Sequence, residues 1–110
     1  MIKTAVVILN WNGRELLGRF LPEVVSNTVS EETAIYVADN GSDDDSVSWI
    51  ESHQPQVKVI KLARNHGYAG GYNRALKQIE AEYYILLNSD VRVEPGWATK
   101  LTTFMDMHPG

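Results

Sequence analysis

Four short apolar runs, rich in β-branched residues, recur along the chain and predict β-strands. They span residues 4–9, 34–38, 57–62 and 83–87. The first run shows no alternation of polar and apolar positions, which is typical of a strand covered on both faces in a parallel sheet. Segments with helical spacing separate the runs, so the chain is predicted to follow the order β-α-β-α-β-α-β.

Apolar residues at helical spacing predict the first connecting helix. The stripe consists of Leu16, Leu17, Phe20, Leu21, Val24 and Val25. Proline is well tolerated in the first turn of a helix, so Pro22 is expected to start a second short helix. The second connecting helix is predicted over residues 44–53, with Ser42 or Asp43 as its N-cap.

Two further helices are expected. One runs over residues 69–79 and the other follows Pro95, ending near residues 108–110. The predicted inner face of the last helix consists of Trp97, Leu101, Phe104 and Met105.

Parallel strands joined by right-handed crossovers place such helices around one twisted sheet. The expected fold is therefore a three-layer α/β/α arrangement with a mostly parallel, Rossmann-like sheet. Ligands of such sheets bind beyond the carboxyl ends of the strands. Polar residues follow all four predicted strands, in segments 10–12, 39–42, 63–67 and 88–90. A binding site is therefore expected at this edge of the sheet.

Composition and charge narrow the classes of function. The 110 residues suit one domain, and 44% hydrophobic with 22% charged residues is ordinary for a globular protein. Ten basic and fourteen acidic residues give a net charge of -4, which disfavours nucleic acid as a partner. The sequence has no cysteine, no run apolar enough to span a membrane and no signal-peptide pattern. A cytoplasmic location is expected.

Asp39 ends the second predicted strand and begins the sequence Asp-Asn-Gly-Ser. This is strong turn chemistry, in which Gly41 can adopt a positive φ. A carboxylate at a strand end can also accept a hydrogen bond from a base N–H or a ribose hydroxyl. Both interpretations, turn and ligand contact, remain open at this stage.

Asn88, Ser89 and Asp90 follow the fourth predicted strand. A carboxylate here could bind a hard divalent cation, Mn²⁺ or Mg²⁺, that also bridges diphosphate oxygens. The alternative is an ordinary turn with Asx-type hydrogen bonds.

The segment 67–73, Gly-Tyr-Ala-Gly-Gly-Tyr-Asn, opens the third predicted helix. Its small residues would let a ligand approach the backbone at a helix N-terminus, or would let the helix pack closely on the sheet. The segment follows the third strand and lacks the Gly-x-Gly-x-x-Gly spacing, so the dinucleotide-binding pattern of dehydrogenases is absent.

Trp11 either flanks a planar base at the strand end or lies in the core. Arg64 either reaches a phosphate or is a solvated surface residue. His53, His66 and His108 have no spacing typical of a metal site or a Ser-His-Asp triad, and they are assigned no role.

These segments, in this order, resemble family 2 glycosyltransferases, which have the glycosyltransferase-A fold. The resemblance covers nearly the whole chain and rests on four motifs in register. They are Val-Val-Ile-Leu-Asn-Trp-Asn-Gly at 6–13, Asp-Asn-Gly-Ser at 39–42, Asn-x-Gly-x-Ala-x-Gly-x-Asn at 65–73 and Leu-Leu-Asn-Ser-Asp at 86–90. The chain is most similar to bacterial members that build surface polysaccharides, including rhamnosyltransferase-like enzymes.

The resemblance implies a nucleotide site and a metal site. The nucleotide-binding residues it implies are Leu9, Asn10, Trp11, Asn12, Asp39, Gly67, Gly70, Asn73 and Ser89. Asp90 would ligate Mn²⁺ or Mg²⁺, assisted by Asn88, although the family often has Asp-x-Asp where this sequence has Asn88-Ser89-Asp90.

The family transfers a sugar from a nucleoside diphosphate to an acceptor hydroxyl, usually with inversion. The resemblance therefore implies a saccharide or lipid-linked acceptor and a general base that lies beyond Gly110. The chain is then a truncated, donor-binding portion that is inactive alone. Its full-length parent would be cytoplasmic, with the inner face of the membrane as an alternative location.

Two other classes of function remain as alternatives. A sugar-nucleotide nucleotidyltransferase should have a glycine-rich, basic loop after the first strand, and residues 10–14 supply little of it. A non-catalytic interaction domain should show no nucleotide-dependent rise in melting temperature.

Overall fold

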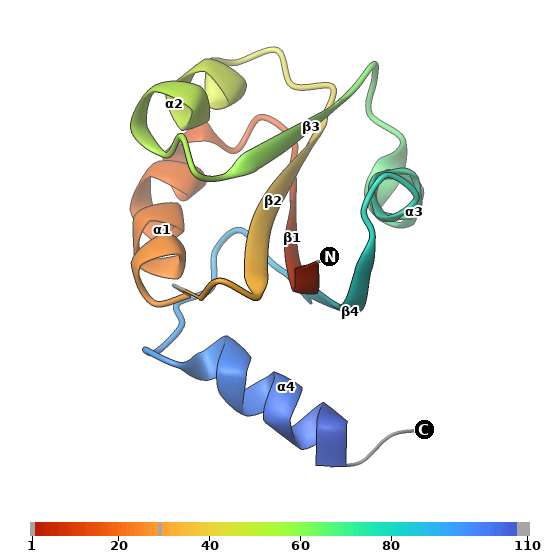
Figure 1. Cartoon of the computed structure of the whole chain (residues 1–110). Coiled ribbons are helices and arrows are strands. Elements are labelled where there is room, and N and C mark those ends of the chain that lie inside the picture. The colour runs from red at the N-terminus through yellow and green to blue at the C-terminus, as the bar shows by residue number, and fades with distance from the viewer. Residues whose placement is uncertain (1, 29, 108–110) are drawn as a thin grey trace.

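All four apolar runs are strands in the structure, a computed structural model that describes residues 2–28 and 30–107. The strands are β1 (Ile2–Asn10), β2 (Thr33–Asn40), β3 (Lys58–Leu62) and β4 (Ala81–Leu87). The helices are α1 (Arg14–Ser26), α2 (Ser46–His53), α3 (Gly67–Leu76) and α4 (Trp97–Met107). The strands form one parallel sheet in the order β3-β2-β1-β4 (Figure 1). The predicted α/β fold is confirmed.

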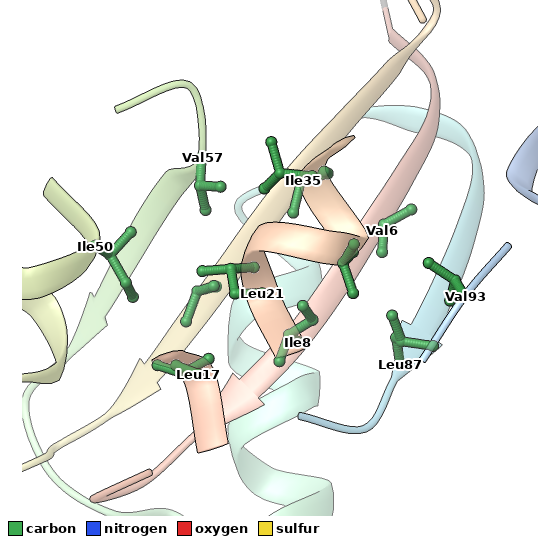
Figure 2. Close-up of a cluster of buried hydrophobic side chains, with 12 residues drawn as sticks. Val6, Ile8, Leu17, Leu21, Ile35, Ile50, Val57, Leu87 and Val93 are labelled. Atoms are coloured by element: carbon green, nitrogen blue, oxygen red, sulfur yellow. The ribbon is translucent and has the colours of Figure 1, made fainter. Parts of the chain in front are cut away.

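Successive side chains of a strand point to opposite faces of the sheet, and each face has its own hydrophobic cluster. Val6 and Ile8 of β1 pack on the side of α1 and α2, where Leu17 and Leu21 of α1 lie over the strands (Figure 2). The other cluster consists of Ala5, Val7, Ala38, Ile60, Tyr72, Ala75 and Ile79, the last residues coming from α3 and the turn after it. Helices therefore lie on both faces of the sheet, as a three-layer fold requires, although Tyr84 and Leu86 of β4 are exposed on the face that carries α3.

Helix α1 is continuous, so the expectation that Pro22 starts a second helix is wrong. Proline lacks the N–H that would bond to the carbonyl of Gly18, and inside a helix this costs about 3 kcal/mol. Three apolar residues before and after Pro22 are buried against the sheet, namely Leu17, Leu21 and Val24. Burial of each such side chain contributes about 1.5–3 kcal/mol, which together exceeds the cost of the proline.

The ends of α2 and α3 also differ from the prediction. Helix α2 begins at Ser46 with Asp45 as its N-cap, so neither Ser42 nor Asp43 has that position. Helix α3 begins at Gly67 and ends at Leu76, three residues before the predicted end. The backbone N–H groups of residues 78 and 79 bond to carbonyls three residues earlier, which tightens the chain into a turn there.

Helix α4 lies at the amino-terminal edge of the sheet, apart from the other helices (Figure 1). Its indole donor, Trp97 Nε1, bonds to Thr28 Oγ1 at 2.8 Å. The buried residues of the helix are Ala98 and Thr102, which are small enough for close packing. The predicted inner face is therefore wrong for two of its members: Leu101 and Phe104 are 44% and 60% exposed. The predicted end of this helix, near residues 108–110, lies outside the described residues.

In the described part of the chain, no helix combines the length and apolar character needed to cross a membrane.

An ion pair ties α4 to the sheet. Asp106 accepts hydrogen bonds from Lys3 Nζ at 2.5 Å and from the Tyr83 hydroxyl at 2.7 Å. The bond from Lys3, followed by that from Tyr83, lowers the pKa of Asp106 below its ordinary 3.8. The same pairing raises the pKa of Lys3 above 10.5.

The substitution Lys3→Met is expected to raise the pKa of Asp106 toward 3.8, since the hydrogen bond from Lys3 is the main cause of the lowered value. Because the folded pKa lies below the unfolded one, the carboxylate's stabilising contribution is present above about pH 3.8 and is lost as pH falls through the folded pKa. A carboxyl NMR titration measures this, with Tyr83→Phe as the control expected to give a smaller rise. An unchanged Asp106 pKa in Lys3→Met would contradict the pairing.

Candidate functional site

The carboxyl ends of β1, β2 and β4 lie at one edge of the sheet. Asn10, the last residue of β1, is the direct register partner of Asp39 in β2. On the other side of β1, the pairing with β4 extends to Ile8 and Leu87. The ends of β2 and β4 are thus two strand spacings apart, about 10 Å. Because β3 is parallel to β2 and ends beside it, the fold brings all four predicted polar segments to one edge.

Asp39 is the centre of a hydrogen-bond network at this edge. Its side chain is only 5% exposed. One oxygen, Oδ1, accepts from Asn10 Nδ2 at 2.9 Å and from Ser42 Oγ at 2.7 Å. The other, Oδ2, accepts from the backbone N–H of Ser42 at 3.1 Å. The turn interpretation of Asp39 is confirmed, and Gly41 within this turn has the expected positive φ of 77°.

Asn10 lies beneath the loop that follows β1. It is buried, its Nδ2 also contacts Ser42 Oγ at 3.3 Å, and its Oδ1 accepts from the N–H of Gly13 at 3.2 Å. Its side chain therefore holds Asp39 and the loop in place, and the adjacent backbone carries Trp11 outward.

Asn12 joins the loops after β1 and β2. It has a φ of 50°, a left-handed conformation that asparagine tolerates well. Its Oδ1 accepts from the N–H groups of Asp43 at 2.7 Å and Asp44 at 3.3 Å, while its own N–H donates to Ser42 Oγ at 2.9 Å. These contacts fix the exposed loop against the turn that contains Asp39.

Asp44 completes the join between the two loops. It accepts from the N–H of Arg14 at 3.2 Å, from the N–H of Ser46 at 3.0 Å, and from the Ser46 hydroxyl. Burial acts to raise the pKa of Asp44, but these hydrogen bonds outweigh it and lower that pKa below 3.8. The carboxylate therefore stays ionised through the neutral range.

Trp11 is 54% exposed, so its interpretation as a core residue is wrong. The residue follows β1 directly, beside the buried pair of Asn10 and Asp39. An exposed indole at a strand end offers a flat apolar surface against which a ring can stack.

The glycine-rich start of α3 serves close packing at one position and remains open at another. A Cβ on Gly71 would lie 2.8 Å from Leu9 Cδ1 and 2.9 Å from Asn40 Nδ2, so the helix backbone rests on the strand ends. A Cβ on Gly67 would meet no atom within 4 Å. Gly70 is partly buried, and Asn73 is exposed on the same helix. The packing interpretation therefore holds for Gly71, while Gly67 leaves room for a ligand.

Asn40 is a buried structural residue that the sequence-based site prediction omitted. Its Nδ2 donates to Asn65 Oδ1 at 3.1 Å and to the Gly67 carbonyl at 3.0 Å, and its Oδ1 accepts from the His66 N–H at 3.0 Å. It fixes the entry into α3 against the end of β2. Its position as the second polar residue at a strand end was the available signal.

Arg64 and His66 lie in the loop before α3. Arg64 is exposed, in agreement with either interpretation of this residue. Burial, followed by the positive charges of Arg74 and Arg64, lowers the pKa of His66 below 6.5. The imidazole is therefore mostly neutral at pH 7, and the positive charge around it comes mainly from Arg64 and Arg74.

Asn88 and Asp90 are exposed in the turn after β4, and Ser89 between them is partly buried. Among residues 2–28 and 30–107, no group of three or more His, Asp or Glu side chains could hold a metal ion. One carboxylate with an amide and a hydroxyl oxygen nevertheless suits Mg²⁺ or Mn²⁺, since such ions are often held by one or two carboxylates, water and substrate phosphates. The donor set at this turn fits a metal that arrives with a phosphate ligand.

Two hollows lie away from this edge. One, of about 470 Å³, is lined by residues of α2, β3, the chain between them and Gln78 after α3. The other, of about 440 Å³, lies beside the start of β2. Neither is lined by a predicted site residue.

Known proteins resemble this chain over nearly its whole length. The model of glycosyl transferase family 2 matches residues 5–110. YfnE of Bacillus subtilis strain 168, named an uncharacterized glycosyltransferase, is 34% identical over 92 residues, which are 82% of this chain and 24% of YfnE. TarS of Staphylococcus aureus strain Mu50, a poly(ribitol-phosphate) β-N-acetylglucosaminyltransferase, is 26% identical over 112 residues, which are 98% of this chain and 20% of TarS.

The fold is shared with a solved structure as well. The crystal structure of S. aureus TarS 1–349 in complex with UDP matches with a TM-score of 0.83 and 25% identity, over 97% of this chain and 33% of that one. The chain thus spans between a fifth and a third of the length of these relatives. The family match over residues 5–110, on a parallel α/β sheet with its polar network at the strand ends, shows that the chain belongs to glycosyl transferase family 2.

Proposed function

We propose that this chain binds the nucleoside-diphosphate sugar donor of a glycosyltransferase at the edge formed by β1, β2 and β4. Membership of family 2 supports the reaction class, and the similar TarS has been crystallised with UDP. The parent enzyme transfers the sugar to an acceptor hydroxyl with inversion. The acceptor, a saccharide or a lipid-linked molecule, and the general base belong in this proposal to the larger remainder of such proteins.

The observation that carries the proposal is the hydrogen-bonding state of Asp39. The carboxylate accepts three hydrogen bonds from Asn10 and Ser42. An ionised carboxylate has about four acceptor sites, so one remains for a base N–H or a ribose hydroxyl. Its neighbours hold it rigidly, and little conformational entropy is lost when a ligand bonds to it. Trp11 and Asn12, exposed beside it, would border the base.

Asn88, Ser89 and Asp90 would face the diphosphate from the end of β4. Asp90 would ligate Mn²⁺ or Mg²⁺, and Asn88 would assist. The cation, when bound, stabilises the negative charge that develops on the departing diphosphate. Gly67, Gly70 and Asn73 at the start of α3 would border the nucleotide, where the positive end of the helix dipole favours an anion.

In the transfer, the acceptor oxygen forms a bond to the anomeric carbon while the bond from that carbon to the diphosphate oxygen breaks. The electron pair of the broken bond leaves with the nucleoside diphosphate, and the general base takes the acceptor proton. Residues of this chain hold the donor still through the step. Substitution of these residues should therefore weaken binding of the nucleotide part of the donor.

No observation favours the nucleotidyltransferase alternative. The basic residue nearest the first loop, Arg14, lies 4.4 Å over the Trp49 ring and 3.9 Å from Asp45. Its guanidinium therefore lies against Trp49 of α2 and the N-cap residue Asp45.

Titration of the chain with UDP, GDP and dTDP, each with and without Mn²⁺, tests the proposal by calorimetry. We expect one of them to bind more tightly when Mn²⁺ is present. In Asp90→Asn this metal-dependent gain should fall by about tenfold, because a neutral amide is a much weaker ligand for a hard cation. Asp106→Asn, which removes a carboxylate at the opposite edge, is the matched control. Absence of nucleotide binding in every titration would refute the proposal.

A further inference from the structure

Tyr72 bridges the two strands whose ends frame the proposed site. The register pairing of β1 with β4 ends at Ile8 and Leu87. Just past this pair, the Tyr72 hydroxyl accepts a hydrogen bond from the Leu9 N–H at 3.3 Å and donates one to the Leu87 carbonyl at 3.3 Å. A side chain from α3 therefore joins two strands that are far apart in sequence.

The bridged residues immediately precede the two halves of the proposed site. Leu9 lies two residues before Trp11, on the side proposed for the base. Leu87 lies three residues before Asp90, on the side proposed for the metal and diphosphate. The hydroxyl thus sets the separation of the two backbone segments that would contact opposite ends of a nucleoside diphosphate.

Tyr72 is itself held firmly. It is 4% exposed, and its hydroxyl is already engaged with the Leu9 N–H and the Leu87 carbonyl. The preceding Gly71 allows α3 to rest on Leu9, and the ring of Tyr68 packs edge-on against Tyr72 with centroids 5.0 Å apart. Burial raises the pKa of Tyr72 above 10.0, so the hydroxyl keeps its proton at neutral pH and serves both as donor and as acceptor.

We propose that Tyr72 is a positioning residue that couples the base-binding side of the site to its metal-binding side. The inference rests on the proposed function and deepens it, because it assigns to one buried hydroxyl the spacing between the two sides. A purely structural hydroxyl would contribute to folding but would leave the ratio of metal-dependent to metal-free binding unchanged.

Tyr72→Phe separates these roles, because it keeps the ring and removes the hydroxyl. We expect uridine to bind the variant within about twofold of the unchanged chain, whereas the gain in UDP affinity on adding Mn²⁺ falls by about five- to tenfold, the effect of losing a typical pair of hydrogen bonds. The matched control is Tyr84→Phe. Its hydroxyl also donates to a backbone carbonyl, that of Ile79 at 2.7 Å, but at the other end of β4.

A second measurement needs no variant. Mg²⁺ with UDP should shift the NMR signals of the Leu9 amide and the Tyr72 ring, while uridine alone should leave the Tyr72 ring unshifted. If Tyr72→Phe keeps the full Mn²⁺-dependent gain, or if Mg²⁺ with UDP leaves both signals unmoved, the coupling role is overturned while donor binding stands. Where the unchanged chain binds GDP or dTDP in place of UDP, that nucleotide and its nucleoside replace UDP and uridine in both measurements. If the unchanged chain binds none of the three nucleotides, with or without Mn²⁺, the proposed function fails and the inference fails with it.

Discussion

Asp39→Asn is expected to weaken nucleotide binding by about ten- to a hundredfold. A hydrogen bond to a charged acceptor contributes about 1.5–3 kcal/mol, and each 1.4 kcal/mol corresponds to about tenfold in affinity. Asparagine also turns one acceptor into a donor, so its amide nitrogen meets either the Ser42 N–H or the donors from Asn10 and Ser42. Calorimetry with the nucleotide that binds the unchanged chain measures the loss.

The matched control is Ser42→Ala. It removes the hydroxyl that donates to Asp39 Oδ1 and accepts from the Asn12 N–H, but it leaves the Asp39 side chain itself unchanged. We expect about 1 kcal/mol lower stability in this variant, the value of a typical hydrogen bond, with nucleotide affinity reduced by less than in Asp39→Asn. If Ser42→Ala weakens binding as much as Asp39→Asn does, the network's rigidity explains the effect and direct contact by Asp39 does not.

The strands were predictable because burial on both faces of a parallel sheet leaves a continuous apolar run, as in residues 4–9. The helices were less predictable. Pro22 suggests a helix start when viewed alone, and only the burial of Leu21 and Val24 on the same sheet face explains why the helix continues. In α4, the large residues Leu101 and Phe104 suggested the inner face, whereas the structure buries the smaller Ala98 and Thr102 there.

The edge that carries the candidate site was predictable, whereas the contacts beneath it were not. Parallel strands bring their carboxyl ends together, so Asp39 and Asp90 could be assigned to one edge before the structure was known. The roles of the residues beneath this edge could not be predicted from the sequence. The Tyr72 hydroxyl bonds to Leu9 and Leu87, and a tyrosine in a helix carries no sign of which strand ends it will meet. Asn40 is similar, because its three bonds reach a loop about 25 residues away.

Gly41→Ala is expected to destabilise the chain by more than about 3 kcal/mol. A left-handed φ costs a residue with a side chain about 1–2 kcal/mol, and Gly41 has a φ of 77°. A Cβ there would also lie 2.5 Å from both the Cα and the carbonyl carbon of Arg64. Because these are backbone atoms, no side-chain rotation relieves the overlap, and the loops after β2 and β3 must move apart. Unfolding in denaturant measures the loss.

Gly67→Ala is the control that separates the conformational cost from the steric cost of Gly41→Ala. Gly67 has a nearly identical φ of 75°, but a Cβ on it would meet no atom within 4 Å. We therefore expect it to lose only the conformational cost, about 1–2 kcal/mol. The difference between the two variants measures how tightly the turn containing Asp39 is pressed against the loop that leads into α3. Equal losses would mean that the two loops separate freely, and the rigid placement of Asp39 would then have to come from Asn10 and Ser42 alone.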